Sequence, residues 1–186
     1  MESYHGVSIV YEDNHLLVVV KPPNMPTQAD DSGDADLHST MKAYIAERYS
    51  KPGAVYLGLV HRLDRPVGGV MVFAKTSKAA SRLSRQIREG GMQKEYLAVV
   101  HGLPPAEGRM EDFLLKDGTK NRVKVVREGI PGAKRAALSF RREAARRDRS
   151  LVRVFLETGR PHQIRVQFAS RGYPLLGDMR YGRGEG

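Results

Sequence analysis

The chain has 186 residues, of which 40% are hydrophobic, and this is enough for one domain with its own core. Its 31 lysines and arginines outnumber its 21 acidic residues, and the formal charge of +10 favours a polyanionic partner, nucleic acid ahead of an anionic membrane. The lack of cysteine excludes disulfides, thiolate zinc sites and a cysteine nucleophile, and the lack of a long apolar run excludes a membrane-spanning helix.

The first half of the chain predicts four strands and two helices. The strands are expected at Val7–Tyr11, Leu16–Val20, Val55–Val60 and Val70–Ala74, and the helices at Leu37–Tyr49 and Ser77–Glu89. Ser77 is the expected N-cap of the second helix. On that helix the spacing turns one set of side chains inward (Ala79, Ala80, Leu83 and Ile87) and a basic set outward (Arg82, Arg85 and Arg88).

The second half is dominated by strand patterns. Strands are expected at Tyr96–Val100, Arg109–Leu115, Val123–Val126, Ala136–Arg141 and Leu151–Leu156. The arginine-rich stretch Arg141–Arg149 predicts a polar connector, and Pro161 favours the start of a last helix that ends near Arg171. Many strands with a few helices predict an α+β fold, a mixed and mainly antiparallel sheet with flanking helices.

Three familiar kinds of site fail on their own patterns. Gly69 to Thr76 nearly matches a phosphate-binding loop, but Ala74 replaces its second glycine and strand formers fill the loop positions. His61, Asp64, His162 and Asp178 have no recognised metal-ligand spacing. No Gly-x-Ser-x-Gly elbow is present for a serine nucleophile. The sequence therefore predicts neither a metal nor a cofactor.

Three motifs occur in a fixed order along the chain: His61–Gly69, Gln93–Gly102 and Glu157–Val166, the last followed by Gly172–Asp178 and Tyr181-Gly182. In this order and spacing they resemble the RluA-type pseudouridine synthases, and Tyr11–His15 with Val18–Pro22 extends the resemblance to nearly the whole chain. It implies a single catalytic domain over residues 1–186, without an N-terminal accessory RNA-binding domain and short at the C-terminus. A polar start without a signal-peptide pattern adds the expectation of a cytoplasmic protein.

The resemblance implies that uridine in RNA is isomerised to pseudouridine. This reaction breaks the N1–C1′ bond, turns the base and joins C5 to C1′, so it needs a carboxylate and a proton acceptor but no cofactor. By resemblance Asp64 is the nucleophile. Whether it attacks C1′, adds to the ring or promotes elimination stays open. The motif departs from the family at Val67-Gly68, where Thr-Ser is usual.

The same resemblance gives roles to the other motif residues. Tyr96 is expected to stack on the target base and to take part in transfer of the C5 proton, and Arg165 is expected to keep Asp64 ionised. Arg62 is expected beside the flipped nucleotide, with His61 ordering the loop. The remaining expected RNA-binding residues are Arg160, His162 and Gln163.

The expected partner is structured RNA, a ribosomal or transfer RNA stem-loop, bound by a monomer and without a membrane. The outward arginines of the helix at 77–89 and the arginine-rich connector are candidate contacts to RNA backbone. Two alternatives remain open. One is a non-catalytic RNA-binding module on the same fold, and the other is a metal-dependent hydrolase that uses His61, Asp64 and His162.

Overall fold

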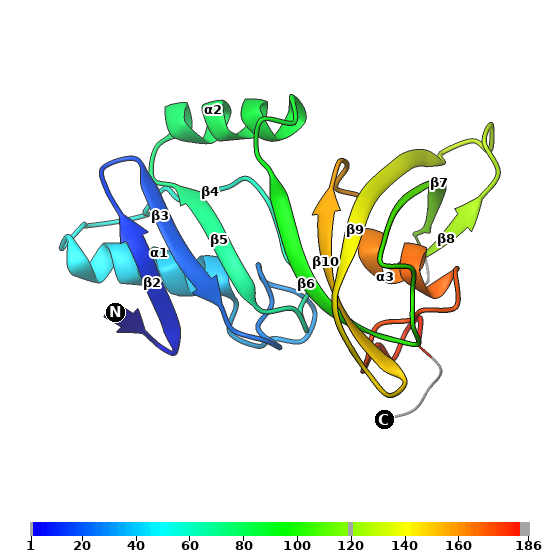
Figure 1. Ribbon diagram of the computed structural model, residues 1–186. Coiled ribbons are helices and arrows are strands. Elements are labelled where there is room, and N and C mark those ends of the chain that lie inside the picture. Colours follow the sequence, from blue (N-terminus) through cyan, green and yellow to red (C-terminus); the bar gives the residue numbers. More distant parts are fainter. Residues whose placement is uncertain (1, 119–120, 183–186) are drawn as a thin grey trace. The chain divides into compact units, whose positions relative to one another are not determined.

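The structure is a computed structural model that describes residues 2–118 and 121–182. The chain divides into two compact units, residues 1–91 and 92–186, and each contains one five-stranded antiparallel sheet with helices (Figure 1). The expected α+β class with antiparallel strands and flanking helices is confirmed, with the strands divided between two sheets. None of the helices in the described ranges is long and apolar enough to cross a membrane.

The first unit has the sheet order β1-β2-β3-β5-β4. Its elements are β1 (Glu2–Tyr4), β2 (Val7–Glu12), β3 (Leu16–Lys21), α1 (Leu37–Arg48), β4 (Gly58–Leu59), β5 (Gly69–Ala74) and α2 (Ser77–Arg88). The inward residues of the central strands, among them Leu17 and Phe73, form one core with the buried face of α1, which includes Met41 and Ile45. This core supports the segment between β4 and β5, where Asp64 lies.

The second unit has the sheet order β6-β10-β9-β7-β8. Its elements are β6 (Lys94–His101), β7 (Glu107–Asp117), β8 (Arg122–Val126), β9 (Lys134–Arg146), β10 (Arg149–Leu156) and α3 (Gln163–Ala169). From α3, Phe168 packs against Phe140 with ring centroids 5.2 Å apart, and Val166 is buried beside Leu114 and Val123. The helix that begins within the third motif is therefore fixed to the sheet on its apolar side.

Several element boundaries differ from the sequence-based expectations, and one strand is additional. The strand expected at Val55–Val60 is reduced to Gly58–Leu59, because Val55 and Leu57 are buried in the core without joining the ladder. The N-cap of α2 is Thr76 and not Ser77, since the Thr76 hydroxyl accepts from the Ala79 N–H. The strand β1 was not expected. The last helix begins at Gln163, because His162 adopts a left-handed conformation (φ 52°) that a helix cannot include.

The expected connector Arg141–Arg149 is wrong, because this stretch forms the long β9–β10 hairpin (Figure 1). Its turn is Arg147-Asp148, with Arg147 in the left-handed region. Ladder pairing extends out to Arg146 and Arg149. Near the base of the hairpin, Arg141 and Arg153 both bind Glu143, so opposite charges stabilise strands whose composition alone predicts a loop.

Candidate functional site

The backbone on both sides of Asp64 is held by the rest of the first unit. The Thr27 hydroxyl donates to the Leu63 carbonyl at 2.8 Å and accepts from the Leu63 N–H at 3.3 Å. The Val67 N–H donates to the Asp64 carbonyl at 3.0 Å and closes a turn. Leu63 packs on the core, Asp64 is half-buried, and Arg62 is exposed. The candidate nucleophile therefore lies on an ordered turn.

A buried lysine organises the other side of this turn. Lys21 takes the third inward position of β3, after Leu17 and Val19, and is 0% exposed. Its ammonium group donates to the carbonyls of Pro22 (3.1 Å), Met25 (2.6 Å) and Arg65 (3.0 Å). A buried ammonium group that makes three hydrogen bonds has all its donors satisfied.

Electrostatics link Lys21 to the candidate nucleophile. Burial lowers the pKa of Lys21 from its ordinary value, while the negative charge of Asp64 acts in the opposite direction and favours the ammonium form. Lys21 thus contributes both to the conformation of the turn and to the electrostatic potential around it.

His61 completes the sheet where β4 ends. The last β4–β5 pair is Leu59 with Phe73, and the next N–H along β5, that of Val72, donates to His61 Nε2 at 3.0 Å. Because Nε2 accepts this bond, the ring proton of neutral His61 resides on Nδ1. This contact supports the expected role of His61 in ordering the loop.

We expect Thr27→Val to disorder the Asp64 turn. Valine has nearly the same shape but leaves the buried N–H and carbonyl of Leu63 without their partner, at a cost of about 1–3 kcal/mol in the free energy of unfolding. Thr27→Ser keeps the hydroxyl and is expected to lose less. Urea unfolding of the two variants tests this, and equal loss in both would mean that packing, not hydrogen bonding, holds the turn.

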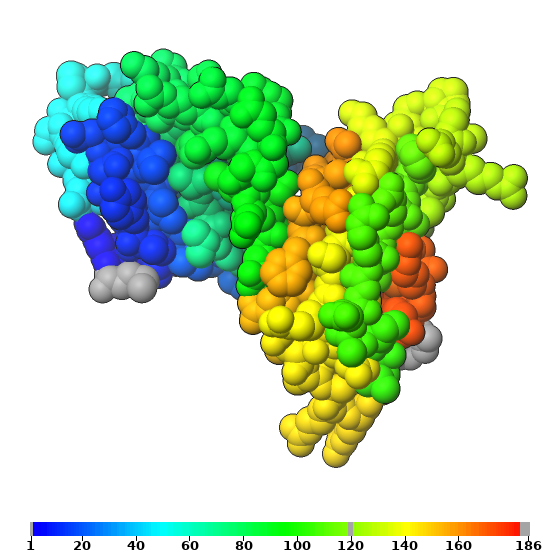
Figure 2. Space-filling model, turned by 45° about the horizontal axis from the view of Figure 1, so that its top comes forward, coloured from blue at the N-terminus to red at the C-terminus, as the bar shows by residue number. Residues whose placement is uncertain are grey.

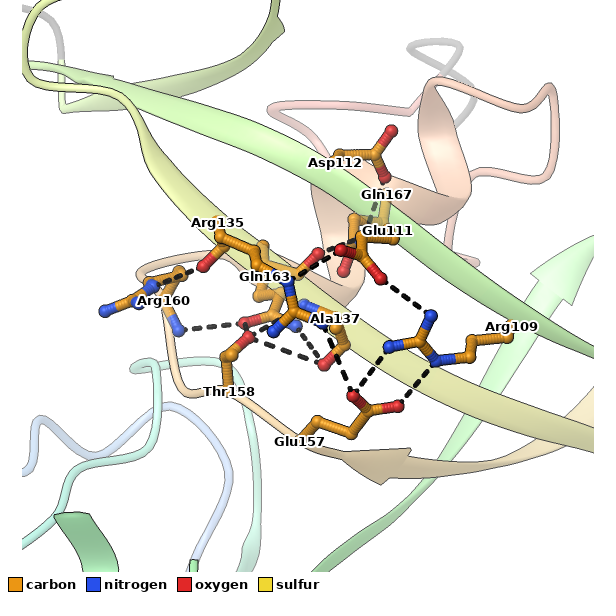
Figure 3. Close-up of polar contacts among 11 residues, drawn as sticks. Arg109, Glu111, Asp112, Arg135, Ala137, Glu157, Thr158, Arg160, Gln163 and Gln167 are labelled. Carbon is orange, nitrogen blue, oxygen red and sulfur yellow. Dashed lines mark hydrogen bonds and ion pairs between the residues drawn. The ribbon is translucent and has the colours of Figure 1, made fainter. Parts of the chain in front are cut away.

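The third motif follows β10, and Gln163 connects its parts (Figure 3). The Gln163 side chain is 3% exposed. Its carbonyl oxygen accepts from the Thr158 hydroxyl (2.8 Å) and the Arg160 N–H (2.9 Å), and its amide donates to the Ala137 carbonyl (3.1 Å). Arg160 is half-buried and donates to the Arg135 carbonyl. The sequence analysis expected Gln163 to bind RNA. In the structure its side chain fixes the loop that contains Thr158 and Arg160.

Charged side chains brace the start of the same loop (Figure 3). Arg109 binds Glu157 through two hydrogen bonds of 2.9 Å, and Arg109 and Arg135 both contact Glu111. Hydrogen bonds from Arg135 and Arg109 hold the pKa of Glu111 at about 2. The groups are exposed, so each pair stabilises the fold only slightly, and their main effect is on the geometry of the loop.

Arg165 is oriented by a buried carboxylate. Its Nε and Nη2 each lie 2.7 Å from an oxygen of Asp178, whose side chain is only 4% exposed. Burial acts to raise the pKa of Asp178, but hydrogen bonds from Arg165 and from the N–H groups of Arg180 and Tyr181 together lower it. Asp178 is therefore an anion in the folded protein, and its two-point contact fixes the guanidinium plane.

Tyr181 connects Arg165 with His162. The Tyr181 hydroxyl accepts from the Val123 N–H at 2.8 Å and also lies within hydrogen-bond distance, 2.7 Å, of His162 Nδ1. The Arg165 guanidinium lies 5.1 Å from the centroid of the Tyr181 ring. One tyrosine thus orders two of the expected site residues.

Tyr96 lies on β6 opposite Val154, half-buried against the second core together with Ala98 and Ile164. The second unit therefore contains Tyr96, Arg160, His162, Gln163 and Arg165, and the first contains His61, Arg62 and Asp64. Over residues 2–118 and 121–182 no group of three or more histidine, aspartate and glutamate side chains could hold a metal ion.

Sequence reasoning missed the residues that orient these groups. For Lys21 a signal existed, because it continues the inward alternation of Leu17 and Val19. Asp178 had been considered only as a possible metal ligand, whereas it binds Arg165. Thr27 had no local signal, since its partner is 36 residues away in the chain.

Comparison with known proteins gives one consistent result. Residues 15–170 match the protein-family model described as RNA pseudouridylate synthase. Ribosomal large subunit pseudouridine synthase D of Zymomonas mobilis is 37% identical over 179 residues, which are 95% of this chain and 56% of that protein. Ribosomal large subunit pseudouridine synthase C of Escherichia coli is 36% identical over 179 residues, 94% of this chain and 53% of that one. The chain spans about half the length of these curated relatives.

A solved structure titled Human RNA Pseudouridylate Synthase Domain Containing 4 has the same fold. It superposes with a TM-score of 0.81 and covers 96% of this chain and 70% of its own, at 23% sequence identity. At this identity the likeness shows the fold alone.

Proposed function

Because the chain belongs to the RNA pseudouridylate synthase family, we propose that it isomerises uridine in RNA to pseudouridine. The observation that carries this proposal is the family match over residues 15–170, which includes the candidate residues Asp64, Tyr96 and Arg165. We propose these three as catalytic residues within one catalytic domain over residues 1–186.

In this proposal Asp64 is the nucleophile. Its support is local: the turn is held by Thr27 and Lys21, and the Lys21 ammonium favours a negative charge close by. Arg165 supplies a positive charge whose direction Asp178 sets. Tyr96 offers a ring for stacking and a hydroxyl for proton transfer. His61 and Gln163 act by positioning, while Arg62, Arg160 and His162 contact RNA.

The proposed substrate is large-subunit ribosomal RNA, because the curated relatives above have that substrate in their names. Transfer RNA is the competing substrate. We propose a monomer that works in the cytoplasm. No redox or group-transfer cofactor is needed, since the reaction breaks the N1–C1′ bond, forms the C5–C1′ bond, releases the C5 proton to solvent and adds a proton to N1.

Release of that proton is the test. Ribosomal and transfer RNA carrying uridine tritiated at C5 would be prepared from cells that lack the protein and incubated separately with the purified full chain. We expect tritium in water from ribosomal RNA and none from transfer RNA. No release from either RNA by a folded protein that still binds RNA would overturn the enzyme assignment in favour of a non-catalytic binding module.

A further inference from the structure

We infer that the outer face of α2 is a docking surface for the phosphate backbone of RNA. This α2 basic face consists of Lys78, Arg82, Arg85 and Arg88. The inference rests on the proposed RNA substrate and adds to it the part of the chain that holds the RNA outside the catalytic residues.

The helical repeat places these cations together. Lys78, Arg82 and Arg85 are spaced by four and three residues, so they share one side of the helix and span about 10 Å along its axis. Arg88 follows one turn after Arg85 and lies beside them. All four are exposed, and the helix contains no acidic residue between Ser77 and Arg88. The face thus presents a row of positive charges without an internal counter-charge.

Several arginines elsewhere in the chain have acidic partners. Ion pairs bind Arg48 to Glu2 and Glu12, Arg141 to Glu143, and Arg153 to Glu95 and Glu143. By contrast, no ion pair or hydrogen bond joins a side chain of the α2 basic face to another described residue. Like charges at these spacings repel one another in the free protein, and an anionic partner would remove the repulsion.

The inner face of α2 explains how the helix is held. Ala79, Ala80, Leu83 and Ile87 are half-buried toward the sheet, as the sequence predicts, and no residue of the helix is fully buried. Gly58 on β4 allows close approach, because a Cβ there would lie only 2.9 Å from the Cβ of Ala80. The helix therefore rests on β4 and β5. Its four basic side chains are exposed, and Figure 2 shows the green segment that contains α2 at the surface of its unit.

Backbone phosphate fits this face better than an anionic membrane does. A helix that binds a membrane surface inserts an apolar face, but the apolar side of α2 already packs against the sheet. Between its cations the outer side offers Ser77, Ser81 and Gln86, which are small or polar and can donate hydrogen bonds to phosphate oxygens. Such contacts hold RNA without reading its sequence.

The test is the salt dependence of RNA binding, since each phosphate contact contributes to its slope. The dissociation constant for a fluorescently labelled RNA hairpin would be measured at several salt concentrations with the full chain. For Arg82→Gln/Arg85→Gln/Arg88→Gln we expect a less steep dependence on salt. The magnitude of the slope of log binding constant against log salt concentration should decrease by about two, at roughly 0.7–0.9 per lost contact. Arg82→Lys/Arg85→Lys/Arg88→Lys retains the charges and is expected to keep the wild-type slope.

The matched control is Arg48→Gln/Arg141→Gln/Arg153→Gln, which removes the same number of positive charges from paired sites. It is expected to keep the wild-type slope, and thermal unfolding checks that all variants fold. Equal slopes for the α2 variant and wild type would overturn the inference. So would equal losses in the α2 and control variants, because net charge alone would then explain binding.

Two further readouts separate this inference from the proposed function. Tritium release by wild type, together with an unchanged slope in the α2 variant, would support the enzyme assignment and overturn the docking surface. A reduced slope in the α2 variant, with no tritium release by wild type, would support the docking surface and overturn the enzyme assignment.

Binding to phosphatidylglycerol vesicles tests the membrane alternative. If vesicle binding depended on the α2 basic face while the slope for RNA was unchanged, the partner of this face would be a membrane and the inference would be overturned.

Discussion

Asp64→Asn is expected to reduce tritium release from ribosomal RNA by about a thousandfold or more while the protein stays folded. An amide of the same shape is neutral and cannot act as the carboxylate nucleophile, and loss of a nucleophile removes most of an enzyme's rate acceleration. The turn should persist, because its contacts to Thr27 and Val67 use the backbone of Leu63 and Asp64. Initial rates on saturating RNA, with thermal unfolding in parallel, measure both effects.

The matched control is Asp31→Asn, the same chemical change at an exposed position of the loop between β3 and α1. It is expected to keep the wild-type rate. Asp64→Glu retains the charge but moves the carboxylate by one methylene, so it distinguishes a need for charge from a need for position. If Asp64→Asn kept a tenth of the wild-type rate, Asp64 would have no place in the chemistry.

Local pattern was sufficient for most of the fold. Runs of β-branched and apolar residues identified β3 and β5, whose inward residues such as Val19 and Met71 form the first core. Such runs failed to predict the strand where pairing depends on a distant strand. Val55 and Leu57 look like strand residues and are buried, but only Gly58 and Leu59 find partners on β5. Composition likewise predicted a connector at Arg141–Arg149, and pairing across the β9–β10 hairpin overrode it.

The candidate residues themselves were predictable because they lie in motifs that are continuous in the chain. Their supporting contacts were not. Lys21 reaches the Arg65 carbonyl over 44 positions, and Tyr181 receives the Val123 N–H over 58. No periodicity encodes such pairs, since they arise only when separate elements pack. The motifs thus identify the candidate groups, and tertiary contacts determine how those groups are oriented.

Asp178→Asn is expected to lower the free energy of unfolding by about 3 kcal/mol, because it replaces the carboxylate that binds the largely buried guanidinium of Arg165 with a neutral amide. Glu143→Gln is the control: it breaks the surface pairs with Arg141 and Arg153 and should cost about 0–1 kcal/mol for each pair. Urea unfolding at neutral pH compares the two. Tritium release should also fall in Asp178→Asn, since Arg165 loses its fixed direction.

The loss of stability at acid pH gives a second test of the contact between Asp178 and Arg165, and the pKa of Asp178 fixes its direction. The pKa of Asp178 is lower in the folded protein than in the unfolded chain, so the folded state binds this proton less readily. The stabilisation is complete above the unfolded pKa of about 4 and is lost as pH falls through the folded pKa. Wild type should therefore lose more stability than Asp178→Asn as pH falls below about 4. Parallel acid profiles for the two proteins would show that Asp178 is not the buried anion that holds Arg165. A thermal shift alone could not make that distinction, because loss of packing would lower the melting temperature without changing the acid profile.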